Sequence, residues 1–309
     1  MSAVNQPPTD LNEHLASLIA SRLLEGKVVP VLGAGVNLCG RPPGATWRRG
    51  TYLPDGRELA EELAPPGFRE IGCHELTTIA QYIAALEGEG PLYDRLHELF
   101  DENYPPTRLH RFLASLSRRM RESGESECML IVTTNYDDSL ERAFQEEGEP
   151  YDLVTYIAYG QHRGRFLHTP PDGESTIIDR PNEYIDVGLD QRAVIAKVHG
   201  AVDRAHCDQP NGSGDRPAAP RHRPAPPRSD SYVITEDHYV DYLTHADFTT
   251  LFPVSLASKL HRSHFLFLGY SLRDWNLRVM LYRLRAKQEG RNYRSWSIQP
   301  HPSPIDRVV

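Results

Sequence analysis

The sequence predicts an α/β protein in which a doubly wound, mainly parallel sheet carries a helical insert. The main evidence is four short apolar runs, each followed by small polar residues, at 28–32, 128–132, 194–198 and 265–268. Runs of this kind are typical of fully buried parallel strands. In open α/β sheets, ligands bind beyond the carboxyl ends of the strands. We therefore expect the four polar clusters to share one site.

The first half of the chain is predicted to be helical outside the first strand. Residues 1–11 are expected to be disordered, and apolar residues at helical spacing predict a helix over 12–25 that ends at Gly26. The stretch 40–57 is rich in Gly, Pro and Arg, which predicts an irregular loop. The segment 58–125 has helical periodicity and separates two sheet strands, so this helical insert is expected to be either a long crossover or a small helical subdomain.

The second half returns to the sheet. A helix over 139–145 is expected, capped by Asp137 or Asp138, and weak alternation over 151–168 indicates an added hairpin. The Pro/Arg-rich stretch 204–230 has too little apolar surface to order itself and is interpreted as a disordered surface loop. Helices near 236–261 and over 274–288 and strands over 264–268 and 296–299 complete one domain over 12–309.

The end of the chain leaves its last strand without a covering helix. Only ten residues follow residue 299, whereas a doubly wound sheet normally covers such a strand with a further helix. We therefore expect the chain to be the front part of a longer protein.

Composition excludes several classes of protein. The net charge of −8 argues against a general nucleic-acid binder, and no apolar stretch reaches the roughly 18 residues of a membrane span. The first residues lack the basic start and apolar core of a secretory signal, so a cytoplasmic protein is expected. The four cysteines lack the close C-x₂₋₄-C pairing of a structural zinc site, which predicts reduced thiols and no metal.

The first two polar clusters have competing interpretations. After the first strand comes GAGVN (33–37), whose glycines permit close approach of a ligand and whose N–H groups can point at a pyrophosphate. An ordinary tight turn is the alternative. After the second strand comes TTNYD (133–137), in which Asn135 offers an amide and Asp137 a charge. The alternatives here are a turn residue and a helix cap.

The other two clusters supply a histidine and a hydroxyl. His199 follows a buried strand and precedes Gly200, a position suited to a general base near neutral pH, although a structural histidine is the alternative. In GYSLRD (269–274), Gly269 permits close approach and Ser271 offers a hydroxyl at a helix N-terminus, which favours an anionic ligand.

Five motifs in order resemble the sirtuin-like domain of prokaryotes, the NAD-consuming branch found in antiphage defence proteins. They are GAG, TTNYD, KVHG (197–200), SYVITEDHY (231–239) and FLGYSLRDWN (267–276), and the resemblance runs from about residue 27 to about residue 300. It implies a Rossmann-like core with a helical insert that binds NAD.

The resemblance also implies roles for individual residues. Gly33, Ala34, Gly35 and Asn37 would hold the pyrophosphate and the neighbouring ribose, with Thr134 as a further NAD contact. Asn135 and Asp137 would sit at the nicotinamide ribose and the nicotinamide, and His199 would be the catalytic base. Gly269 and Ser271 would bind the adenosine side.

The chain departs from the protein-deacylating sirtuins. It lacks their two zinc-binding cysteine pairs, its stretch 53–57 matches their G-I-P-D-F-R loop poorly, and Asn37 stands where serine is usual. The departures bear on deacylation more than on NAD binding.

The expected function is therefore that of an NAD glycohydrolase, a bacterial antiphage effector that depletes NAD once a trigger or partner arrives. The alternatives are ADP-ribosyl transfer or deacylation using NAD, a non-catalytic sensor of NAD or ADP-ribose, and a scaffold with a vestigial site. Whether hydrolysis or cyclisation dominates stays open. The expected partners are NAD as substrate, further copies of the chain, and a separate or fused defence protein; zinc, membranes and nucleic acid are not expected.

Overall fold

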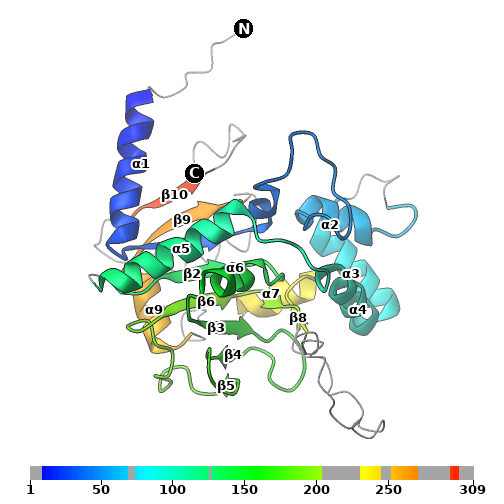
Figure 1. Cartoon of the computed structure of the whole chain (residues 1–309). Coiled ribbons are helices and arrows are strands. Elements are labelled where there is room, and N and C mark those ends of the chain that lie inside the picture. Colours follow the sequence, from blue (N-terminus) through cyan, green and yellow to red (C-terminus); the bar gives the residue numbers. More distant parts are fainter. Residues whose placement is uncertain are drawn as a thin grey trace, which may run out of the picture.

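An eight-stranded sheet forms the centre of the protein, with strand order β10-β9-β1-β2-β6-β3-β4-β5 (Figure 1). The computed structural model describes residues 9–68, 74–124, 127–203, 230–244, 252–270 and 293–298. Strands β10, β9, β1, β2, β6 and β3 are parallel, whereas β4 and β5 join antiparallel at one end. The predicted mainly parallel α/β architecture is confirmed.

The sheet strands fall where apolar runs occur in the sequence. They are β1 (Val28–Leu32), β2 (Leu130–Thr133), β3 (Tyr151–Tyr156), β4 (Phe166–Thr169), β5 (Thr176–Ile178), β6 (Ala193–Lys197), β9 (His264–Leu268) and β10 (Ser295–Ile298). Every residue of β1, β2 and β6 is buried, as expected of strands covered on both faces. The hairpin expected over 151–168 is present as β3 and β4, and β3 also extends the parallel part of the sheet by pairing with β6.

The described helices are α1 (Thr9–Leu24), α2 (Gly56–Leu63), α3 (Leu76–Glu87), α4 (Glu89–Phe100), α5 (Arg108–Ser123), α6 (Ser139–Glu147), α7 (Glu236–Thr244) and α9 (Val254–His261). Helix α1 begins at Thr9, before the expected start at residue 12. Helix α2 begins at Gly56, inside the predicted loop 40–57. Asp55 caps it, because its side chain accepts a hydrogen bond from the N–H of Glu58. The expected helix over 274–288 lies outside the described residues.

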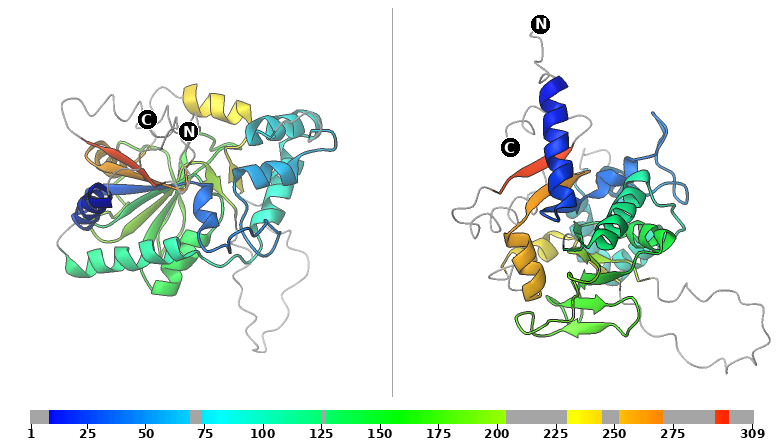
Figure 2. Two further views of the ribbon diagram at one scale, coloured as in Figure 1. Left: turned by 90° about the horizontal axis from the view of Figure 1, so that it is seen from above. Right: turned by 60° about the vertical axis from the view of Figure 1, so that its left-hand side comes forward.

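Helices cover both faces of the sheet. Leu113 and Met120 of α5 and Phe144 of α6 share a core with Ile131 of β2. On the other face, α9 contributes to a core built around the alternate residues of the same strands. Figure 2 shows α5 lying along one side of the fan of strands when it is seen from above. The sheet therefore lies between two helical layers.

The helical insert is smaller than the segment 58–125 predicted from the sequence. Helices α2, α3 and α4 build a separate core, whose members include Leu59, Ile79 and Leu96. Helix α5 falls within the predicted insert but packs on the sheet, because its apolar residues form one stripe that faces β2. Tyr136, which follows β2, and Tyr232 also belong to this core. The Pro/Arg-rich loop predicted over 204–230 lies outside the described residues except for Asp230.

Candidate functional site

The four polar clusters leave the sheet at the same edge. In the parallel register, Leu32 at the end of β1 pairs with Leu268 of β9 and with Thr133 of β2. Thr133 in turn pairs with Lys197 at the end of β6. Since all four strands point the same way, the segments that follow them start side by side. The sheet topology thus brings the four polar clusters to one edge, as the sequence predicted.

The glycines after β1 are required by the packing of the protein itself. The N–H of Gly33 donates to the carbonyl of Leu268 at 3.0 Å, and the N–H of Gly35 donates to the carbonyl of Gly269 at 2.8 Å. A Cβ on Gly35 would lie 2.6 Å from that Gly269 oxygen, and Gly269 has a φ of +66°. Both N–H groups are occupied by protein carbonyls, so contacts of this loop with a pyrophosphate would come from other atoms.

Residues Ala34–Leu38 form a short 3₁₀ helix, η1, after Gly33. The buried side chain of Asn37 donates from Nδ2 to the carbonyl of Pro54 at 3.2 Å. Its Oδ1 has no hydrogen-bond partner among the described residues. A buried acceptor without a partner loses about 1–3 kcal/mol relative to a satisfied one. Asn37 therefore holds an oxygen suited to a donor on a bound ligand.

The loop after β2 contacts the loops after β1 and β9. Asn135 is 8% exposed and donates from Nδ2 to the carbonyl of Gly33 at 3.3 Å. The neighbouring Thr134 pairs with Tyr270, whose hydroxyl donates to Oγ1 of Thr134 at 2.8 Å. Three of the four clusters are therefore in direct contact through described side chains.

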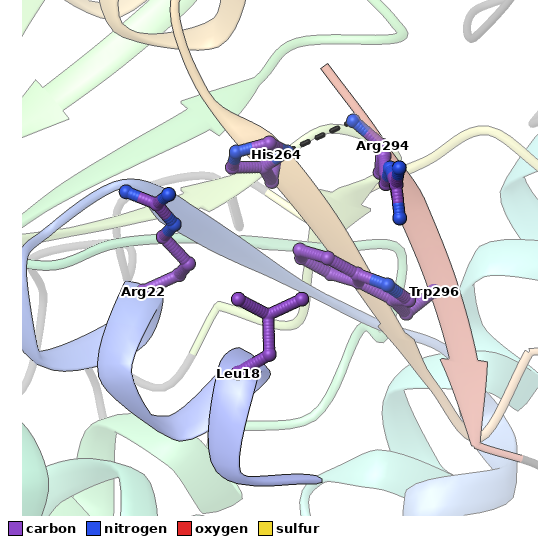
Figure 3. Close-up of a pocket in the computed structure, with 5 residues that line it drawn as sticks. All are labelled: Leu18, Arg22, His264, Arg294 and Trp296. Carbon is purple, nitrogen blue, oxygen red and sulfur yellow. Dashed lines mark hydrogen bonds between the residues drawn. The ribbon is translucent and has the colours of Figure 1, made fainter. Parts of the chain in front are cut away.

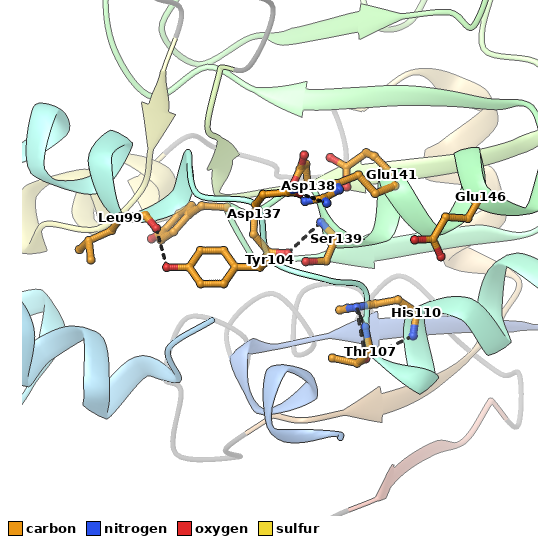
Figure 4. A network of polar contacts seen from close by, with 12 residues as sticks. Leu99, Tyr104, Thr107, His110, Asp137, Asp138, Ser139, Glu141 and Glu146 are labelled. Carbon is orange, nitrogen blue, oxygen red and sulfur yellow. Dashed lines mark hydrogen bonds and ion pairs between the residues drawn. The ribbon is translucent and has the colours of Figure 1, made fainter. Parts of the chain in front are cut away.

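Asp137 caps helix α6 and also keeps an unsatisfied oxygen. Its Oδ1 accepts from the N–H of Ser139 at 3.0 Å, whereas Asp138 makes no side-chain cap (Figure 4). Its Oδ2 is buried without a hydrogen-bond partner in the described part of the chain. Burial lowers the pKa of the nearby His110, and the negative charge of Asp137 opposes that effect only in part. The helix-cap interpretation of Asp137 holds, and one carboxylate oxygen remains for another role.

His199 lies just beyond the neighbouring strand end, two residues after the last residue of β6. Lys197 of β6 pairs with Thr133 of β2. His199 comes two residues after Lys197, and Asn135 comes two residues after Thr133, so both lie at adjacent points of this edge of the sheet. The imidazole is buried and makes an edge contact with the ring of Tyr239, with centroids 5.5 Å apart. Ser271, predicted to lie in the same site, is outside the described residues.

Gly200 fixes the path of the chain beyond His199. Its φ is +87°, and a Cβ there would lie 1.9 Å from the carbonyl oxygen of Ser231. The backbone of His199 is held as well, since its carbonyl accepts from the N–H of Val233 at 2.8 Å. The segment from 231 to 233 therefore determines where the histidine sits.

Sequence reasoning missed three residues that shape this edge. Lys197 is 1% exposed and bonds to the carbonyls of Tyr136 and Asp137 and to Glu141. A lysine inside the apolar run 194–198 was the available signal, because a lysine is almost never buried unless it is paired. Tyr270 and Glu141 gave no comparable signal, since their roles depend on contacts between distant segments.

A pocket of about 300 Å³ lies at the opposite, amino end of the strands. It is lined by Leu18, Arg22, His264, Arg294 and Trp296, and Figure 3 shows the two α1 residues facing the strand residues. His264 begins β9, whereas the predicted site lies beyond the last residue of that strand. This pocket is therefore separate from the polar clusters.

Three further findings concern only the described part of the chain. No group of three or more His, Cys, Asp and Glu side chains is arranged to hold a metal ion there. None of its helices has the length and apolar character needed to cross a membrane. Cys39 and Cys128 are free thiols, and the other two cysteines lie outside the described residues.

Comparison with known proteins agrees with the fold and with the motifs. A family model described as a SIR2-like domain matches residues 129–308. The chain belongs to the SIR2-like family. The sirtuin-like resemblance and the Rossmann-like fold that it implied are thus confirmed.

One relative of this SIR2-like protein carries a functional name. It is 28% identical over 247 residues to "NAD(+) hydrolase ThsA" of Acinetobacter baumannii (strain 532279). The aligned part covers 78% of this chain and 38% of the relative. The chain thus spans well under half the length of that relative.

Proposed function

We propose that this SIR2-like protein hydrolyses NAD to nicotinamide and ADP-ribose. The observation that carries the proposal is the set of buried polar side chains gathered at one edge of the sheet. Asn37, Asn135 and Asp137 follow β1 and β2, and His199 follows β6. The similarity to a relative named as an NAD(+) hydrolase supports the same reaction.

The proposed site fits the polar groups of NAD. Asn37 and Asp137 each hold a buried oxygen that no described residue satisfies. NAD offers ribose hydroxyls and a carboxamide as donors, which would remove the penalty of about 1–3 kcal/mol for each unsatisfied acceptor. Residues 34–37, Thr134, Gly269 and Ser271 complete the binding surface in this proposal, with the glycines allowing the loops to meet.

The reaction needs no general acid. The nicotinamide ring of NAD is a pyridinium, so it leaves as a neutral molecule when the bond to the ribose breaks. Ordinary glycosidases need a protonated carboxyl group to assist departure, but this substrate does not. The protein has to stabilise an oxocarbenium-like ribose and to aim a water at its anomeric carbon.

The site residues divide these two tasks. Asp137 and Asn135 place negative charge and an amide dipole near the positive ribose. His199 takes one proton from the attacking water, whose oxygen bonds to the anomeric carbon, and then releases that proton to solvent. The products are nicotinamide, ADP-ribose and a proton. General base assistance of this kind contributes about 10²–10⁴-fold to the rate.

The test is product analysis after incubation of the purified protein with NAD. We expect nicotinamide and free ADP-ribose in equal amounts, and a loss of about 10²-fold or more in His199→Ala and Asn135→Ala. His264→Ala, at the other end of the sheet, is the matched control and should keep the activity. Full activity in both variants would overturn the roles proposed for His199 and Asn135.

The same experiment separates the alternatives. ADP-ribose attached to a protein or peptide acceptor would show transfer in place of hydrolysis. Saturable NAD binding without nicotinamide release, with and without the neighbouring proteins of the same operon, would show a sensor. A melting temperature that NAD does not raise would show a vestigial site.

We also propose that NAD depletion serves antiphage defence and that the active form is a cytoplasmic homo-oligomer controlled by a trigger or a defence partner. The family resemblance supports this wider role. Phage challenge of bacteria that express the protein tests it: survival that depends on His199 is expected, and equal protection by His199→Ala would contradict it.

A further inference from the structure

Lys197 connects the two loops that carry the proposed reacting groups. It is the last residue of β6 and its side chain is 1% exposed. Its Nζ donates to the carbonyl of Tyr136 at 3.3 Å, to the carbonyl of Asp137, and to Oε1 of Glu141 at 2.7 Å. All three acceptors belong to the loop after β2 or to the first turn of α6.

The position of this ammonium is specific. The carbonyls that it binds belong to Tyr136 and Asp137, the two residues after Asn135. His199 lies two residues after Lys197, just beyond the end of β6. Glu141 lies in the first turn of α6, and Figure 4 shows it beside Asp138. One charge therefore fixes the spacing between the loop of Asn135 and the strand end of His199.

Folding alone does not call for a charged pair at this place. The residues of β6 that face the same side, Ala193 and Ile195, are apolar and belong to the core with α5 and α6. Replacement of a buried ion pair by apolar residues of similar volume is often neutral or stabilising. We propose that Lys197 is a positioning residue, which holds the 133–138 loop in the geometry needed for cleavage of NAD.

This inference rests on the proposed NAD hydrolysis, and the chain supplies a matched control for it. Lys259 is 3% exposed and donates to the carbonyl of Gly26 at 2.6 Å and to Oε2 of Glu127 at 2.7 Å. Like Lys197, this buried ammonium binds backbone carbonyl and carboxylate oxygens. Gly26 and Glu127, however, precede β1 and β2 and so lie at the amino end of the strands.

The experiment compares two double variants, Lys197→Met/Glu141→Met and Lys259→Met/Glu127→Met. Each removes a buried lysine together with its carboxylate, so neither variant leaves a buried charge unpaired. In the control, Arg262 also loses its ion pair with Glu127, but its side chain is 47% exposed and stays solvated. We expect the first to lower kcat for NAD hydrolysis by about 10–100-fold, because a small misplacement of a reacting group has effects of this size. Its KM should change by less than about 3-fold, and the control should keep both constants.

Two single variants sharpen the result. Glu141→Gln keeps the ammonium and its two carbonyl contacts, so kcat should be retained. Lys197→Arg keeps the charge, but a planar guanidinium cannot reproduce the contacts of a compact ammonium, so kcat should fall. If the double methionine variant shows no cooperative unfolding in urea and so is not folded, Lys197→Arg takes its place in the kcat measurement. Wild-type kcat in a folded variant that lacks Lys197 would overturn the inference.

Amide hydrogen exchange separates this inference from the proposed function. If the wild-type protein releases no nicotinamide under any condition, NAD hydrolysis fails. Faster exchange of residues 133–138 in Lys197→Met/Glu141→Met than in the Lys259 control would then still support positioning. Equal exchange in both would refute it.

Discussion

Gly35→Ala tests how closely the loops after β1 and β9 are packed. The new Cβ would lie 2.6 Å from the oxygen, 2.9 Å from the Cα and 3.0 Å from the carbonyl carbon of Gly269. These are backbone atoms, so no side-chain rotation can relieve the clash. Non-bonded carbon and oxygen atoms normally stay about 3.3 Å apart or more, so the two loops would separate by roughly 0.7 Å.

The energetic consequence follows from this separation. The hydrogen bond from the N–H of Gly35 to Gly269 is 2.8 Å long and would be stretched beyond its useful range. Overpacking costs about 1–3 kcal/mol and a lost hydrogen bond about 1 kcal/mol, so the free energy of unfolding should fall by about 2–4 kcal/mol. NAD turnover should fall as well, because both loops border the proposed site.

Urea unfolding followed by circular dichroism measures the effect, with Gly90→Ala as the matched control. Gly90 lies in α4, and nothing lies within 4 Å of the Cβ that it would gain. Alanine there should leave the free energy of unfolding unchanged or raise it by up to about 1 kcal/mol. A Gly35→Ala protein as stable as Gly90→Ala would refute the packing argument.

Two further predictions concern stability. Burial lowers the pKa of His110, whose Nδ1 accepts from the N–H of Thr107 at 3.2 Å. The folded state therefore keeps His110 neutral, and the free energy of unfolding should fall as the pH drops below about 6.5, where the unfolded chain takes up the proton. In His110→Asn the urea midpoint should depend less on pH between 7.5 and 5.5, and an unchanged dependence would contradict this. Replacement of residues 204–229 by a short Gly/Ser linker should change the free energy of unfolding by less than about 1 kcal/mol, because the N–H of Asp203 already lies 2.7 Å from Oδ1 of Asp230. A larger loss of stability in urea unfolding would show that the replaced segment contributes to the folded core.

The strands and the site edge were predictable because they depend on local pattern. The apolar run at 28–32 is β1, and the run at 194–198 is β6 with a shift of one residue. Because these strands are parallel, the polar residues that follow them lie at one edge of the sheet. This is why Asn135 and His199 were expected at one edge of the sheet from sequence, although their positions on neighbouring strands were not predicted.

The contacts that decide individual roles were not predictable in this way. The family resemblance implied a ligand-binding role for Gly35, whereas its N–H and its missing Cβ both serve the contact with Gly269. Helix α5 was assigned to the insert because periodicity shows which face is apolar but not which core that face joins. Lys197 and Glu141 lie 56 positions apart, and only the fold brings them together.

The most direct test of the account is a crystal structure of His199→Ala with NAD bound. We expect the pyrophosphate beside residues 33–37 and the anomeric carbon of the nicotinamide ribose near Asn135 and the space left by the imidazole. NAD bound elsewhere, for example against Arg22 and Trp296 at the amino end of the strands, would contradict the proposal that these strand ends form one site.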